Sequence, residues 1–134
     1  MNIRSLDIKA NSIDDLIGSL KSGFSADSFD KLKKCLKISD NMLSKIVHIP
    51  QRTLTRRRRD GRLRPDESER VLRIANIYDK AREVFETEIA TEKWLKKPSR
   101  GLGYKIPLEY ADTEPGAREV LKLLSRIEHG IFPG

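Results

Sequence analysis

The sequence predicts an all-α fold, and three observations indicate it. Apolar residues recur at intervals of three and four through most of the 134 residues, which is the period of a helix with one buried face. No segment shows the strict apolar–polar alternation of a half-buried strand. Proline and glycine stand where the periodic segments stop, most densely in "KKPSRGLGYKIP".

The first 25 residues are polar and only weakly periodic, so we treat residues 1–25 as an N-terminal extension. One short amphipathic helix is predicted around residues 12–21, with mobile ends.

Two further helices are predicted before the middle of the chain. The first spans residues 28–36, with Ser28 as a candidate N-cap. The second follows Ser39, another N-cap candidate, and ends by His48, because Pro50 excludes the residue before it from helical geometry. Pro50 in turn suits the first turn of a fourth helix.

That fourth helix is expected to run to about Arg59 and to stop before Gly61. A long helix then begins at Pro65, where Asp66 and Glu69 resemble a capping box. We expect it to reach Thr91, because apolar residues recur every three or four positions: Val71, Ile74, Ala75, Tyr78, Ala81, Phe85 and Ile89.

After residue 91 the predicted helices are shorter, because proline and glycine interrupt the segment. A short helix is possible at 108–111, and Thr113 can cap a last helix running from Pro115 through Ile127. Gly130 can end that helix in a left-handed turn. We therefore divide the chain after the extension into residues 26–91, which include the long linking helix, and residues 92–134.

The charge of +7 is concentrated in one short stretch. Residues 1–73 hold 17 Lys and Arg against 10 Asp and Glu, whereas residues 74–134 hold 10 of each. Residues 50–64 alone hold seven arginines and one aspartate. A basic patch beside a neutral half indicates one dedicated surface for a polyanion.

The segments on either side of residues 47–50 have the proportions of a helix-turn-helix. Leu54 would dock on the preceding helix, at Met42, Leu43 and Ile46, and so leave the opposite polar face free. Gln51 and Arg52 would lie where a recognition helix meets base edges, since glutamine reads adenine and arginine reads guanine. The predicted DNA-binding residues are Gln51, Arg52, Thr55, Arg56, Arg57, Arg58, Arg59, Arg62 and Arg64.

Within this set, Arg57 and Arg58 are turned toward the flanks of the helix. With Arg62 and Arg64 they suit contacts to phosphate, which position a protein without specifying sequence. DNA phosphate is thus the expected counter-charge of the four consecutive arginines. The alternative is that the run is a solvated face or a localisation signal.

Two long segments resemble a known family. "LSKIVHIPQRTLTRRRRDGRLRPDESERVLRIA" is similar to the central part of Xre/ParS/MbcA-type antitoxins, and "WLKKPSRGLGYKIPLEYADTEPGAREVLKLLSRIEHGIFPG" resembles their C-terminal toxin-binding domain. The resemblance covers roughly residues 28–134. The chain departs from the family pattern at Ser44, where alanine is usual, at His48, where glycine is usual, and at Tyr104, where a second small residue is common.

The resemblance implies a RES-domain toxin as partner, an enzyme that consumes NAD. The antitoxin is expected to block the toxin's cleft and to repress their shared operon by binding operator DNA. The predicted toxin-binding residues are Trp94, Leu102, Gly103, Tyr104, Arg126, His129, Ile131, Phe132 and Gly134.

The closing "RIEHGIFPG" suggests how the cleft would be blocked. Pro133 restricts Phe132 to extended geometry, which lowers the entropy lost on docking. Phe132 would anchor the tail while the Gly134 carboxylate stands in for substrate phosphate. For this tail, folding back onto its own domain is the alternative, and for Trp94 a place in the protein's own core is equally open.

Other functions find less support. The two histidines and one cysteine show no metal-ligand spacing and no nucleophile–base signature, so we expect neither an enzyme nor a cofactor. No signal peptide or membrane-spanning run is recognisable, and a cytoplasmic location is expected. A homodimer, or a hetero-oligomer with the toxin, is expected, with the first helix or the long helix as the seam. The principal alternative is a stand-alone helix-turn-helix repressor without a toxin, and a purely structural adaptor is a third.

Overall fold

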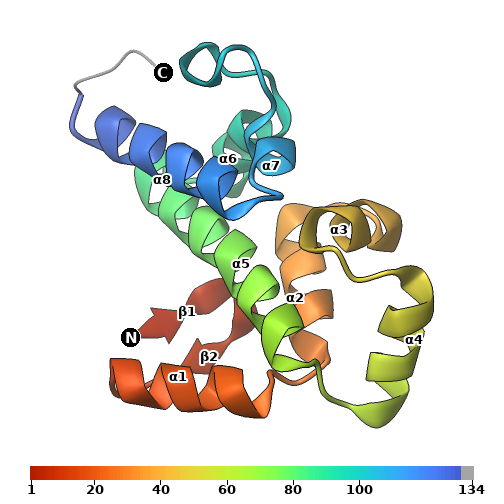
Figure 1. Ribbon diagram of the computed structural model, residues 1–134. Helices are drawn as coiled ribbons and strands as arrows, with labels where there is room; N and C mark the ends of the chain where they lie inside the picture. The colour runs from red at the N-terminus through yellow and green to blue at the C-terminus, as the bar shows by residue number, and fades with distance from the viewer. Residues whose placement is uncertain (131–134) are drawn as a thin grey trace. The chain divides into compact units, whose positions relative to one another are not determined.

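The computed structural model describes residues 1–130 and confirms the all-α prediction (Figure 1). The chain forms two compact units, Met1–Ala75 and a second that begins at Asn76. Their boundary falls inside α5 (Pro65–Phe85), the helix that was expected to link the two halves.

The N-terminal residues are part of the first unit. β1 (Asn2–Ile3) pairs antiparallel with β2 (Ile8–Lys9) around the 3-10 turn η1 (Arg4–Leu6), a pairing the sequence did not predict. Leu6 is 1% exposed, and Ile3 is also buried. The expected mobile end is therefore an anchored one, because these two side chains enter the core.

The predicted first helix is present as α1 (Ile13–Ser22), and the Ser12 hydroxyl caps it by accepting from the Asp15 N–H at 3.2 Å. None of its residues is buried, although its apolar side chains share one face. Ile13 is 56% exposed and Ile17 is 40% exposed.

Three helices build the rest of this unit's core: α2 (Asp27–Leu36), α3 (Asp40–Val47) and α4 (Gln51–Asp60). Ser39 caps α3 as predicted, and Gly61 ends α4 with a φ of 85°. Ser28 is not the cap of α2, because that helix begins one residue earlier and buries Ser28. Side chains without exposed surface fill the centre: Phe29, Leu32, Leu43, Val47, Ile49 and Leu54.

The prediction that one helix runs from Pro65 to Thr91 is wrong. α5 ends at Phe85, and Glu86 takes a left-handed φ of 67°. A separate helix, α6 (Glu88–Lys96), follows. Thr87 caps α6 by accepting from the Ala90 N–H at 3.1 Å. The apolar period continues through the break, so periodicity alone does not reveal it.

The second unit contains α6, the 3-10 turn η2 (Arg100–Leu102), α7 (Pro107–Tyr110) and α8 (Glu114–Glu128). Thr113 caps α8 as predicted. Gly116 is required there, because a Cβ would overlap the carbonyl oxygen of Tyr110. The buried side chains of this core come from all of its helices: Ile77, Ala81, Leu95, Leu108, Val120, Leu123 and Leu124.

Candidate functional site

The helix-turn-helix of the first unit is formed by α3, the turn at residues 48–50 and α4. His48 ends α3 in the left-handed region, with a φ of 54°, at the position where the resemblance noted from sequence leads us to expect glycine. The Arg70 guanidinium from α5 donates to the carbonyl oxygens of Val47 (2.7 Å) and His48 (3.2 Å). These bonds satisfy carbonyl groups that the end of α3 leaves unpaired, and so fix the turn.

The recognition helix α4 buries Leu54 completely and turns its polar face to solvent. The exposed residues of this face are those the sequence placed there: Gln51, Arg52, Thr55, Arg56 and Arg59. Neither Arg52 nor Arg56 forms an ion pair within residues 1–130, whereas Arg59 is 3.5 Å from its neighbour Asp60. Two or three guanidinium groups on one exposed face therefore have charge available for an external anion.

A shallow hollow of about 390 Å³ lies between α3 and the start of α4, lined by Asn41, Ser44, Lys45, His48, Pro50 and Gln51. The Gln51 amide nitrogen donates to the Asn41 side-chain oxygen at 3.4 Å. Asn41 and Lys45 were not predicted as site residues. They precede the turn in sequence, and only the folding of α3 against α4 brings them beside Gln51.

Arg57 was expected on the flank of the helix as a phosphate contact, but its side chain lies inside the first unit. Its side chain is buried and donates to both carboxylate oxygens of Glu67, at 2.8 and 3.2 Å. Glu67 also accepts from the Arg64 N–H at 2.8 Å, in the position of a capping box at the start of α5. Burial alone would raise the pKa of Glu67, but the hydrogen bonds from Arg57 and Arg64 outweigh it, and the pKa lies below its ordinary value.

Arg58 also has partners in its own chain. Its guanidinium donates to Asp40 (2.9 and 3.0 Å) and to Asp30 (2.5 Å), and it lies over the Phe29 ring at 5.5 Å. Hydrogen bonds from Arg58, and then from Lys33, hold the pKa of Asp40 well below its usual range. Carboxylates of the same chain thus serve as the counter-charge of Arg57 and Arg58, and Arg59 has the weaker surface contact with Asp60.

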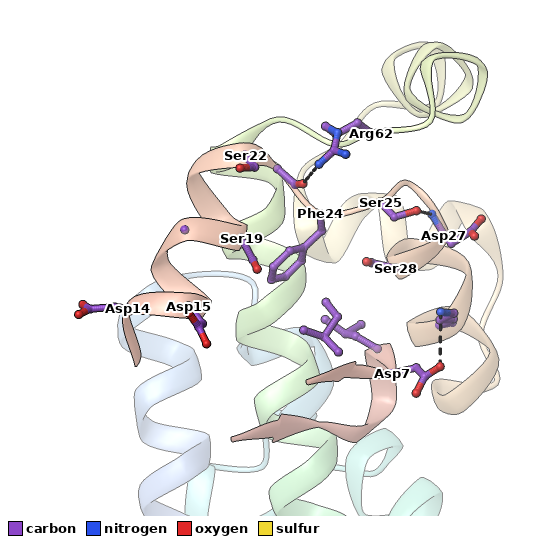
Figure 2. Close-up of a pocket in the computed structure, with 15 residues that line it drawn as sticks. Asp7, Asp14, Asp15, Ser19, Ser22, Phe24, Ser25, Asp27, Ser28 and Arg62 are labelled. Atoms are coloured by element: carbon purple, nitrogen blue, oxygen red, sulfur yellow. Dashed lines mark hydrogen bonds and ion pairs between the residues drawn. The ribbon is translucent and has the colours of Figure 1, made fainter. Parts of the chain in front are cut away.

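The last two predicted phosphate contacts differ from each other. The Arg62 guanidinium donates to the Gly23 carbonyl oxygen at 2.7 Å, at the rim of a pocket of about 650 Å³ in this unit (Figure 2). A Cβ at Gly23 would overlap the carbonyl oxygen of Leu63, so this close chain approach needs glycine. Arg64 is exposed and its side chain forms no ion pair among the described residues.

The Gly/Pro-rich loop of the second unit is held at its base by Ser99. The Ser99 N–H donates to the Lys105 carbonyl (2.9 Å), and the Ser99 carbonyl accepts from the Tyr104 N–H (2.8 Å). Gly103 and Tyr104 both take left-handed backbone, with φ values of 64° and 66°. Tyr104 is 69% exposed, so a bulky ring is displayed at a position whose backbone favours the small residue usual in the family.

Trp94 is half-buried, and its ring lies 5.4 Å from that of Phe85, tilted by 35°. Of the two roles left open from sequence, the packing inside its own unit is present, and Trp94 also lines a pocket. Its contact with a toxin stays a prediction. Leu102 is half-buried beside Gly103 in the loop.

The remaining predicted toxin-binding residues lie at or beyond the end of α8. Arg126 and His129 are exposed there, and Gly130 takes the predicted left-handed turn with a φ of 67°. Ile131, Phe132 and Gly134 lie outside the described residues, so the predictions for them remain predictions.

No helix among residues 1–130 combines the length and apolar character needed to cross a bilayer. No group of three or more His, Cys, Asp or Glu side chains in the same range could hold a metal ion.

Comparison with known proteins agrees with both halves of this description. Residues 15–76 match the antitoxin Xre-like helix-turn-helix domain, and residues 80–130 match the antitoxin Xre/MbcA/ParS C-terminal toxin-binding domain. The chain is 40% identical to an antitoxin Xre of Yersinia enterocolitica over 87% of its own length and 80% of the relative's.

Two other relatives extend the range of similarity. An antitoxin Xre of Photorhabdus laumondii is 33% identical, over 96% of this chain and 88% of the relative. A Prs ADP-ribosylating antitoxin of a Sphingobium strain is 24% identical, over 88% of this chain and 80% of the relative. With both domains matched in order and relatives aligned over most of their length, the chain belongs to the Xre/MbcA/ParS family of antitoxins.

Proposed function

We propose that this antitoxin binds and inhibits a RES-domain toxin that consumes NAD, and that it represses the shared operon by binding operator DNA. The observation that carries the proposal is the joining, in one chain, of a helix-turn-helix with unpaired exposed arginines and a matched toxin-binding domain. Both activities are binding activities, and the proposal assigns no catalytic residue and no cofactor to the chain.

For operator recognition we propose the exposed face of α4. Gln51, Arg52 and Arg56 read base edges, with Thr55 and Arg59 beside them, and Arg62 and Arg64 contact phosphate. Arg57 and Arg58 are left out of this surface because carboxylates of the same chain hold them.

For the dimer that two operator half-sites require, we propose the apolar face of α1 as the seam. Ile13, Leu16, Ile17 and Leu20 lie on one face at helical spacing, and none of them is buried within the chain. Replacing Ile17 with Glu should convert a dimer to a monomer in sedimentation analysis without loss of helix content. A variant that stays dimeric would exclude this seam.

For toxin inhibition we propose that the tail beyond Gly130 enters the toxin's NAD cleft. Phe132 anchors it and the Gly134 carboxylate takes the place of substrate phosphate, with Arg126 and His129 at the rim. Truncation after Glu128 should restore NAD consumption by the toxin in the presence of antitoxin, while operator binding persists. Equal inhibition by the truncated and full chains would refute the role of the tail.

The experiment that tests the whole proposal is co-expression of the antitoxin with the product of the neighbouring open reading frame. A RES-domain toxin should co-purify, lose its NAD consumption in the complex and shift an operator fragment together with the antitoxin. Operator binding without a co-purifying chain would favour the alternative, a stand-alone repressor.

A further inference from the structure

A pocket of about 390 Å³ in the second unit has features that no role assigned above uses. It lies where the end of α5, α6 and the start of the Gly/Pro-rich loop meet, and its lining is Phe85, Ala90, Lys93, Trp94, Lys97, Pro98 and Ser99. The adjacent, mutually tilted rings of Phe85 and Trp94, together with Pro98, make its walls largely apolar. Such a surface suits an apolar side chain of a partner.

Two buried hydrogen-bonding groups in the pocket lining have no partner among the described residues. They are the indole N–H of Trp94 and the hydroxyl of Ser99. Ser99 as a whole is only 4% exposed. In native structures nearly all buried polar atoms have a hydrogen-bond partner. Two unpaired atoms beside the same pocket therefore need an explanation. An indole N–H can only donate, so the missing partner must bring an acceptor.

The rim of the pocket carries positive charge that the described residues of the second unit do not neutralise. Lys93 and Lys97 are both exposed, and neither forms an ion pair within residues 1–130. The lysine between them in the helix, Lys96, is already paired with Glu92 at 2.7 Å. A ligand that satisfies the rim must therefore supply its own negative charge.

These requirements converge on one chemical group. A carboxylate accepts hydrogen bonds and pairs with ammonium groups, while an apolar residue next to it fills the space between the rings. We propose that this pocket docks a segment of the toxin in which an apolar side chain is flanked by Asp or Glu. The inference rests on the proposed function and adds a second contact, separate from the tail.

The position of Ser99 connects the pocket to the displayed loop. Its backbone bonds to Tyr104 and Lys105 set the loop's base, while its side chain lies in the pocket lining. A toxin segment in the pocket would thus contact Ser99, the residue whose backbone holds Tyr104 and Lys105 in the loop. The pocket and loop together form one docking surface.

The test uses the fact that Trp94 is the only tryptophan of the chain. Full-length antitoxin labelled with 5-fluorotryptophan gives a single ¹⁹F resonance, which reports on this pocket while unlabelled purified RES-domain toxin is added. We expect the resonance to shift on complex formation. In the variant Lys93→Glu/Lys97→Glu, toxin affinity should fall at least about tenfold and lose salt dependence.

Two further variants separate docking from folding. Ser99→Ala removes only an unpaired hydroxyl, so the free protein should unfold at an unchanged denaturant midpoint while toxin affinity falls. The control Lys9→Glu/Lys34→Glu makes the same change in net charge on exposed residues of the first unit and should leave toxin affinity unchanged.

The outcomes distinguish this inference from the function on which it rests. Failure of the wild-type chain to bind the toxin would overturn both. Tight toxin binding with an unmoved ¹⁹F resonance, or full affinity in Lys93→Glu/Lys97→Glu, would overturn the pocket and leave the antitoxin function standing.

Discussion

The two compact units differ in how they treat charge. The first holds the whole excess of +7 and yet pairs three of its four consecutive arginines with its own carboxylates, Arg59 only at the surface with its neighbour Asp60. The second has no net charge, and it presents an apolar pocket with two unpaired lysines and a strained, exposed tyrosine. Charge in a sequence therefore does not equal charge at a surface, and neighbouring arginines on one helix can lie in opposite environments.

The largest effect should come from comparing the neighbours Arg56 and Arg57 in the first unit. Arg57→Ala leaves the buried Glu67 carboxylate without its ion-pair partner, and removing one member of a buried pair costs about 3–5 kcal/mol. Arg56→Ala removes an exposed, unpaired side chain and should change stability by less than about 0.5 kcal/mol. Urea unfolding of both variants measures the difference, and equal stabilities would show that the Arg57–Glu67 pair is not a structural one.

The next effect concerns operator binding. Arg52→Ala/Arg56→Ala should lose about 1–3 kcal/mol for each base contact, measured by fluorescence anisotropy against operator and scrambled DNA. Wild-type affinity should also fall steeply with salt, at a slope near −0.9 per phosphate contact. The double variant should bind toxin normally, since both changes lie in the first unit. Loss of toxin binding by this folded variant would break the separation of the two units.

A smaller effect is expected from acid. The carboxyl pKa values of Glu67 and Asp40 are lowered in the folded chain, so the stability they contribute is complete above their unfolded values, 4.5 and 3.8. It is lost as pH falls through the lower folded values. Urea midpoints should be level from pH 7 to pH 5 and decrease below about pH 4.5. Asp40→Asn should be less stable at pH 7 and lose less on acidification; an identical acid response would mean that other groups dominate.

The smallest effect involves one strained residue in each unit. His48 and Tyr104 both have left-handed backbone, and replacing either with Gly should raise the free energy of unfolding by up to about 1 kcal/mol. Tyr104→Gly should also weaken toxin binding, because it removes an exposed aromatic ring, whereas His48→Gly should not. If both variants bind toxin as the wild type does, the displayed ring has no part in docking.

Features of the fold that depend on residues close together in the sequence could be predicted, and those that depend on contacts between helices could not. The caps at Ser39 and Thr113 and the turns at Gly61 and Gly130 depend on a few adjacent residues, and sequence predicted them. The pairing of Arg57 with Glu67, ten residues away, depends on how α4 meets α5, and sequence gave no sign of it.

The break between α5 and α6 escaped prediction for a different reason. A local signal was present in Thr87, but the apolar period continued through it and suggested one helix. The strand pair at the N-terminus consists of two residues on each side, too short for an alternating pattern. In the candidate sites, the residue types were foreseeable, but which arginines remain exposed is decided by tertiary packing.

The Glu67 carboxylate that holds both Arg57 and the first turn of α5 has a consequence for how such sequences diverge. A change at either position alone removes a buried partner, so positions 57 and 67 should vary together in an alignment of relatives, or not at all. Arg52 and Arg56 have no such partner among the described residues, so these positions can change together with the operator sequence. An alignment of relatives in which position 57 varies freely while position 67 stays acidic would contradict this coupling.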